Sequence, residues 1–207
     1  MEWAAVITLV TVAPALLVML TSFTRIVIVL ALMRQALGLQ QTPPNMVLTG
    51  IALLLTVFVM APVWKGINET AVAPYLAEKI GPEEAIERAE APLRDFMLRQ
   101  TREADLEMAR SLLARGGGGS GADKPASMPF YALVPAFITS ELTAAFRIGF
   151  LIYLPFLAID LVVAAILMAL GMFMLSPTLI SLPLKLLVFT MASGWSLLVS
   201  GLVTSFR

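Results

Sequence analysis

Long apolar stretches, separated by one polar stretch, dominate the pattern along the chain. Residues 3–24 carry no charge, apolar residues resume at Ile26–Met33 and Met46–Met60, and a later apolar region runs from Pro129 to Gly171. About twenty such residues cross the hydrocarbon core of a bilayer as a helix. We therefore expect an all-α, membrane-associated protein.

The charged residues divide this pattern into three regions. Of the 14 basic and 14 acidic residues, twenty lie between Lys65 and Lys124. The chain is predicted to form an apolar helical hairpin at 1–64, a polar helical insert with a Gly-rich tether at 65–128, and a second apolar hairpin at 129–207. Two apolar hairpins thus bracket the polar insert.

In the first hairpin, prolines predict the helix ends. Pro43-Pro44 closes a short polar link, and Asn45 is expected to cap a helix that ends near Ala61-Pro62. Arg34 lies in the link, so the positive-inside tendency places the link on the cytoplasmic side. An acidic Glu2 precedes the first apolar run, which indicates mature protein rather than a secretory signal.

In the second hairpin, Pro135 and Pro155 are expected to break the apolar region. A last helix is expected from Pro183 to Phe206, with the proline in its first turn.

The polar insert reads as helical. Pro82 predicts a helix start, and the residues after Pro92 form an amphipathic pattern with an apolar sector of roughly 160°. The tether that follows is flexible by composition and marks a place where extra length is tolerated. Four carboxylates near the helix start suggest either a cation site or, more simply, a solvated acidic first turn: Glu83, Glu84, Glu87 and Glu90.

Composition narrows the possible functions. The chain has no Cys and no His, so it offers no thiolate metal site and lacks the commonest general base. Its formal net charge is zero, which gives no electrostatic basis for binding nucleic acid. We expect no enzymatic activity, no cofactor and no metal.

Five charged residues lie inside the apolar regions, where charges indicate a function or an assembly contact. Arg25 either snorkels to an interface or has a buried partner at a subunit contact. Glu141 and Arg147 are too far apart in sequence for a clean pair on one helix face. Their partners are therefore expected on other elements or other chains, as for the remaining two charges, Asp160 and Lys185.

Three large apolar side chains, Met172, Phe173 and Met174, follow Gly171 and precede Pro177. The glycine and the proline predict a bend, so both are candidate hinge residues. Flexible thioethers can close around an irregular object, and several copies around an axis would form a soft seal. The alternative is that these side chains only fill gaps in a core.

Several motifs together resemble the FliP/SctR family, the export-gate proteins of bacterial flagellar and injectisome type III secretion. The run Phe96–Leu106 is similar to the flagellar branch. The other motifs are Ser22-Phe-Thr-Arg-Ile26, Thr139-Ser-Glu-Leu142, Ala145-Phe-Arg-Ile-Gly-Phe150, Leu154-Pro-Phe-Leu-Ala-Ile-Asp160 and Met168-Ala-Leu-Gly-Met172.

The resemblance implies a homo-pentamer, joined by FliQ and FliR type subunits and further export-apparatus proteins in a helical ring. It places the chain in the bacterial inner membrane at the flagellar basal body, in contact with lipid and with periplasm-facing portions. The substrates would be unfolded flagellar proteins. The family's methionine gasket falls on Met172 and Met174, with Phe173 where Met is common. The five charges would then meet across subunits.

Two other functions are compatible with the residues. An ion-coupled small-solute secondary transporter would use Asp160, Glu141 and Arg147 as a relay, although the hairpins do not read as repeats of one another. An intramembrane hydrolase would need Glu141 and Asp160 as a close pair, for which the spacing gives no support.

Overall fold

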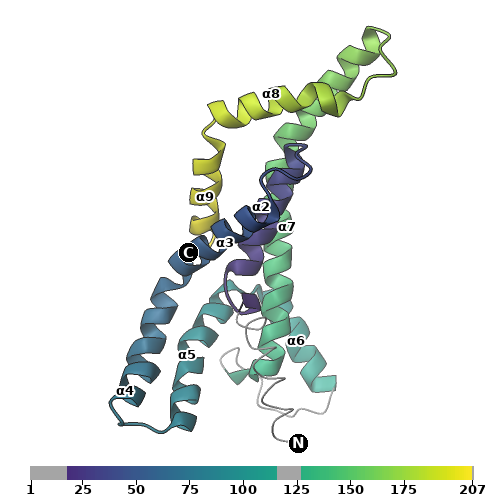
Figure 1. The fold of residues 1–207 in the computed structure, drawn as a ribbon. Helices are drawn as coiled ribbons and strands as arrows, with labels where there is room; N and C mark the ends of the chain where they lie inside the picture. The colour runs from purple at the N-terminus through teal and green to yellow at the C-terminus, as the bar shows by residue number, and fades with distance from the viewer. Residues whose placement is uncertain (1–17, 116–126, 207) are drawn as a thin grey trace, which may run out of the picture. The chain divides into compact units, whose positions relative to one another are not determined.

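The computed structural model describes residues 18–115 and 127–206, and all regular structure in these two ranges is helical. The expected all-α class is confirmed. The order is α2 (Phe23–Ala36), α3 (Asn45–Ile67), a π-helical turn η1 (Asn68–Val72), α4 (Ala73–Leu76), α5 (Pro82–Gln100), α6 (Glu103–Arg115), α7 (Phe130–Ala169), α8 (Pro177–Met191) and α9 (Gly194–Thr204) (Figure 1).

Two helical segments are long and apolar enough to cross a membrane. Within the described ranges these are the 32 residues Asn45–Leu76 and the 40 residues of α7. Helices α8 and α9 meet at a bend of 65° and would supply a third crossing if the pair counts as one broken span. The expected membrane association therefore has its basis in these helices.

Three expected helix breaks are wrong. Pro62 lies inside α3, and α7 continues through both Pro135 and Pro155. All three prolines lie on exposed parts of their helices, where a ring displaces no packed neighbour. In apolar helices, local adjustment can satisfy the backbone group that proline leaves unpaired, so the helix continues.

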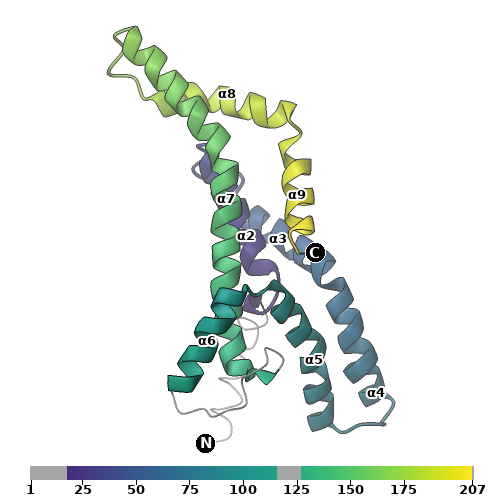
Figure 2. The same cartoon turned by 180° about the vertical axis from the view of Figure 1, so that it is seen from behind.

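The expected last helix is also wrong in its bounds. Helix α8 begins at Pro177 rather than Pro183, and a break at Ser193 separates it from α9. Ser193 has a left-handed backbone with φ of 51°, which interrupts the helical hydrogen bonds. Gly194 follows because a Cβ there would lie 2.3 Å from the Phe189 ring. Figure 2 shows the resulting corner between α8 and α9.

The amphipathic stretch after Pro92 likewise forms two helices rather than one. Helix α5 runs through Pro92 and ends at Gln100, and α6 begins at Glu103. Between them the buried Thr101 has an extended backbone, and its hydroxyl donates to the Met97 carbonyl at 2.7 Å.

The chain divides into two compact units. Unit 1 includes residues 56–143, where α5 and α6 pack with the first part of α7. Phe96 and Phe137 meet edge to face at 6.0 Å between ring centroids, and the Ser140 hydroxyl accepts a hydrogen bond from the Arg102 backbone N–H at 2.7 Å. The polar insert is therefore attached to α7 by both apolar and polar contacts.

Unit 2 comprises residues 25–55 and 144–207, and its described part holds most of α2, the first half of α3, the rest of α7, α8 and α9. Helices α2 and α7 approach closely at Gly149, where a Cβ would lie 2.2 Å from Leu32 Cδ1. The absence of a side chain at this position permits that close approach.

We expect Gly149→Ala to lower the free energy of unfolding by about 1–3 kcal/mol, because the added methyl group would overpack the contact with Leu32. Gly201→Ala is the matched control, since nothing lies within 4 Å of a Cβ at that helical position. It should be neutral or stabilising, because alanine favours a helix over glycine. Thermal unfolding in mild detergent, followed by circular dichroism, compares the two. Equal melting temperatures would contradict the close packing of α2 on α7.

Candidate functional site

The loop that joins α7 to α8, Leu170–Ser176, carries the three predicted seal residues. Helix α7 ends in a Schellman motif: the Gly171 N–H donates to the Met168 carbonyl at 3.1 Å, and the Met172 N–H donates to the Leu167 carbonyl at 2.9 Å. Gly171 has φ of 73°, the left-handed conformation that this motif requires and that glycine adopts without strain.

The other end of the loop is set by the start of α8. Ser176 occupies the N-cap position with an extended backbone, and Pro177 is the first helical residue. Proline suits this position because its fixed φ matches the helix and no N–H is needed there. The Ser176 and Thr178 hydroxyls are hydrogen-bonded at 2.7 Å. Both predicted hinge residues thus lie at the two ends of the loop.

Met172, Phe173 and Met174 are exposed to 46%, 79% and 98%, respectively. Within this one chain they do not fill a core, which was the alternative interpretation. A Cβ at Gly171 would meet nothing within 4 Å apart from its chain neighbours, so the described residues leave open space at this position. Within the described part of the chain, the loop therefore presents one half-exposed and two largely exposed apolar side chains.

A buried ion pair joins α7 and α8, the two helices that flank the loop. The Lys185 ammonium in α8 donates to Asp160 Oδ2 in α7 at 2.6 Å. Ser181, one helical turn before Lys185, donates its hydroxyl hydrogen to Asp160 Oδ1. Lys185 and Ser181 are buried, and the Asp160 side chain is 20% exposed. The structure therefore pairs these two charges inside one chain, without a second subunit.

The same ammonium also closes the end of α2. Lys185 Nζ donates to the Ala36 carbonyl at 3.2 Å. Helix α2 ends in a second Schellman motif, in which Gly38 has φ of 78° and the N–H groups of Gly38 and Leu39 are bonded to the carbonyls of Gln35 and Arg34. A cation at a helix C-terminus is favourable because it faces the negative end of the helix dipole. Lys185 thus holds α2, α7 and α8 together.

Arg25 has a comparable role at the opposite end of α2. It is buried, and its guanidinium donates to the Ser205 carbonyl at 2.8 Å and to the Ser205 hydroxyl at 3.2 Å. The guanidinium also lies 4.0 Å from the centroid of the Phe206 ring. Arg25 is therefore buried with partners from its own chain, and these contacts do not test the expected partner at a subunit contact.

Glu141 and Arg147 differ from these three charges and from each other. Glu141 is fully buried, whereas Arg147 is exposed.

The carboxylates at the start of α5 are exposed or half-buried, and Glu84 and Glu90 pair with Arg88 and Arg94. Within residues 18–115 and 127–206, no cluster of acidic residues is suited to a metal ion.

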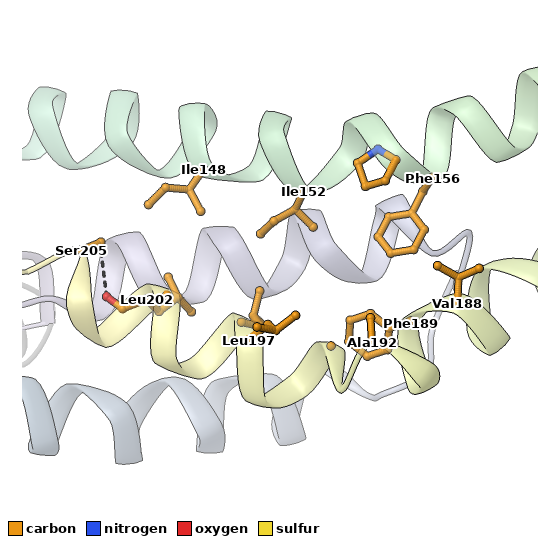
Figure 3. Close-up of a pocket in the computed structure, with 13 residues that line it drawn as sticks. Ile148, Ile152, Phe156, Val188, Phe189, Ala192, Leu197, Leu202 and Ser205 are labelled. Atoms are coloured by element: carbon orange, nitrogen blue, oxygen red, sulfur yellow. Dashed lines mark hydrogen bonds between the residues drawn. The ribbon is translucent and has the colours of Figure 1, made fainter.

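An apolar cavity of about 430 Å³ lies between α7, the end of α8 and α9. Figure 3 shows Ile148 and Ile152 of α7 across from Leu197 and Leu202 of α9. At its end near Ser205 the cavity adjoins the Arg25 contact. Polar contacts therefore stabilise unit 2 at both ends of α2, and apolar side chains line the cavity between α7 and α9.

Sequence reasoning missed the uncharged partners of these cations. Ser181 lies four residues before Lys185 and thus on the same face of α8, but the helix was expected to begin at Pro183, which left Ser181 outside it. The Ala36 carbonyl, Ser205 and Phe206 have no signal in the sequence, since their contacts join positions far apart in the chain.

Comparison with known proteins supports the family suggested by the motifs. The model of the FliP family matches residues 6–202. The chain is 52% identical over 202 residues to the flagellar biosynthetic protein FliP of Cereibacter sphaeroides, covering 98% of this chain and 66% of the relative. It is 51% identical to that of Pectobacterium carotovorum subsp. carotovorum (97% of this chain, 76% of the relative) and 47% identical to that of Bacillus subtilis strain 168 (97% and 89%).

The apolar helices and these relatives define the class: a membrane-associated component of the flagellar export apparatus, not an enzyme. The chain belongs to the FliP family.

Asp160→Asn and Lys185→Met, made singly and together, test the buried pair. Asp160→Asn leaves the ammonium without its carboxylate and should lower the free energy of unfolding by about 3 kcal/mol. The double variant should lose less than the sum of the single losses, with a coupling of about 1–3 kcal/mol. Denaturant unfolding in detergent can be followed through tryptophan fluorescence, to which Trp195 contributes and whose ring packs against Phe189 at 5.6 Å between centroids.

Lys79→Met serves as the control, because Lys79 is exposed in the polar insert. It should leave the unfolding midpoint unchanged. Strict additivity of the Asp160 and Lys185 substitutions would show that the two side chains are not coupled.

Proposed function

We propose that this chain is a pore-forming subunit of the bacterial flagellar type III protein export gate. In this proposal the α7–α8 loops of several copies converge on an axis, and Met172, Phe173 and Met174 form the seal of a channel for unfolded flagellar proteins. The energy for transport comes from other proteins of the apparatus.

The exposure of these three side chains is the observation that carries the proposal. Side chains of this size are normally buried, and a contiguous apolar surface on a loop indicates contact with other molecules. Sister loops around an axis would cover these side chains and, at the same time, create an apolar constriction. Such a constriction excludes water and ions when it is narrow.

The contrast between the loop and the helix segments that carry it supports a gating role. We call these segments of α7 and α8, around Asp160 and Lys185, the base. The base is fixed by Lys185, which contacts both Asp160 and the end of α2. The loop has open space at the Gly171 Cβ position, and its two thioethers adapt their shape easily. A fixed base with a pliable tip would let the seal deform around an extended polypeptide and close again behind it.

The partners follow from the same proposal. We expect a homo-pentamer with FliQ and FliR type subunits, further export-apparatus proteins and membrane lipid. The location would be the inner membrane at the flagellar basal body, with portions that face the periplasm. Residues 1–64, 65–128 and 129–207 would act as the first hairpin, the insert and the hairpin that carries the seal.

The five charges in apolar regions are proposed to support assembly in two ways. Arg25, Asp160 and Lys185 would do so indirectly, because their contacts shape unit 2 and hence the position of the loop. Glu141 is fully buried and would also act through the shape of its own subunit. Arg147 is exposed and would therefore contact a neighbour directly.

The geometry gives less support to a solute transporter or a carboxylate hydrolase. Asp160 is bonded to Lys185 and Ser181. Glu141 is buried and Arg147 exposed, although both lie on α7. The three residues of the hypothetical relay therefore have different surroundings.

Replacement of Met172, Phe173 and Met174 by Ala tests the seal. The narrower side chains should leave a wetted opening, because a constriction excludes water only when it is narrow and apolar. We expect ion conductance of cells that carry the triple variant in the assembled gate to rise at least about tenfold, while export of flagellar proteins continues. Conductance is read from membrane potential and patch recordings.

Met191→Ala is the matched control, because Met191 is a methionine of α8 that is 78% exposed but lies outside the loop. It should leave conductance at the wild-type level. Background conductance in the triple variant, with the variant shown to be assembled, would refute the seal.

A further inference from the structure

One face of α7 in unit 2 is only partly covered by the described part of the chain. Large apolar side chains recur along it at spacings of one, three and four residues, which on a helix places them within a sector of roughly 160°. We call this sector the outer face. Its members are 37% to 64% exposed: Phe146, Phe150, Leu151, Leu154, Leu157, Leu161 and Val162.

Other sides of the same helix segment are occupied. Gly149 packs against Leu32 of α2, while Ile148, Ile152 and Phe156 line the cavity toward α8 and α9. By helix periodicity these positions lie away from the outer face. The outer face is thus the side that remains for another molecule.

Arg147 lies on the outer face. Helix periodicity places it in the same sector, one turn before Phe150 and Leu151 and two turns before Leu154. It is exposed, and it meets no hydrogen-bond acceptor or carboxylate among residues 18–115 and 127–206. Among the described residues, a cation with five N–H donors therefore has no partner and lies amid large apolar side chains.

This combination restricts what can cover the face. Lipid tails would cover the leucines and phenylalanines but would leave the guanidinium unpaired in hydrocarbon. Water would solvate the guanidinium but would leave the apolar side chains exposed. A helix with apolar side chains and one carboxylate at the level of Arg147 satisfies both requirements, because it buries the apolar surface and pairs the charge.

A second copy of this chain is a poor source of that carboxylate. Outside the polar insert the sequence has three acidic residues, Glu2, Glu141 and Asp160. Glu141 is fully buried, Asp160 is bonded to Lys185 and Ser181, and Glu2 lies outside the described residues. The carboxylates visible in the apolar helices are therefore already in use.

We infer that the outer face of α7 is a docking surface for an apolar helix of a different protein, which carries an Asp or Glu opposite Arg147. This inference rests on the proposed function only in requiring an assembly of several subunits. It does not depend on the seal, which lies in the loop at the end of the helix.

The test uses the full chain co-expressed with its natural apparatus and compares Arg147→Glu, Arg147→Met and Arg147→Lys. Arg147→Glu should lower the yield of the complex extracted in mild detergent at least about tenfold, because it places two carboxylates together. Arg147→Met should lower it less, and Arg147→Lys should stay within about twofold, since it keeps the charge. Native mass spectrometry identifies which subunit is lost.

A charge exchange then identifies the partner. Second-site substitutions that restore assembly to Arg147→Glu are selected. They should change an Asp or Glu to Lys or Arg in an apolar segment of another subunit, and they should not improve Arg147→Met. Arg99→Glu is the control for a reversed exposed charge, because Arg99 lies in the polar insert, and it should assemble normally.

Three results would overturn the inference. Normal assembly of Arg147→Glu would show that the charge is not in a contact. Restoring substitutions at Glu2 or at an insert carboxylate of this chain would show contact between copies. Stability in vesicles of phosphatidylcholine with and without phosphatidylglycerol tests for a lipid partner. If the wild-type protein needs the anionic lipid for stability and Arg147→Met does not, Arg147 binds a lipid phosphate. This assembly test does not measure conductance. Its failure would therefore leave the proposed seal untouched, and the triple alanine variant would still test the seal.

Discussion

The ammonium group of Lys185 is the contact on which the arrangement of unit 2 depends. Lys185 belongs to α8, and its ammonium donates to the Asp160 carboxylate of α7 and to the Ala36 carbonyl at the end of α2. A buried ammonium is costly unless all its hydrogen bonds are made, so the three helices cannot separate without exposing or stranding the charge. This contact also sets the position of the loop between α7 and α8, because it fixes both helices a few turns away from the loop. Arg25 does the same at the other end of α2 through Ser205 and Phe206.

The two parts of the proposed gate therefore differ in physical character. Polar groups hold the base, where each hydrogen bond has a direction and only one geometry satisfies it. The loop carries apolar side chains, for which contact has no preferred direction and many arrangements are nearly equal in energy. A seal needs this tolerance because the polypeptide that crosses it changes at every residue. The base needs the opposite property, since sister loops meet only if every copy presents its loop in the same place.

Local rules explain what could be predicted from the sequence, and long-range packing explains what could not. Apolar runs predicted the membrane-type helices, and the Gly171 to Pro177 interval predicted the loop, because composition and backbone preference act within a few residues. The prolines at 62, 135 and 155 were misleading, since a proline on an exposed helix face bends or is accommodated rather than ending the helix. The break at Ser193 was missed because it depends on the Phe189 ring against Gly194. The pairing of Asp160 with Lys185 needs the register of two helices, which no local pattern contains.

The length of α7 has a consequence for how the cell must handle this protein. Forty residues of helix extend about 60 Å, roughly twice the hydrocarbon thickness of a bilayer. If the helix crosses the bilayer along its normal, about half of its length lies beyond the lipid, and the exposed apolar side chains there need cover from protein. An unassembled copy would display that surface to the aqueous compartment, where quality-control proteases and chaperones bind such sequences. In the proposed assembly, synthesis of this subunit should therefore be matched closely to that of its partner subunits, and any excess should be short-lived.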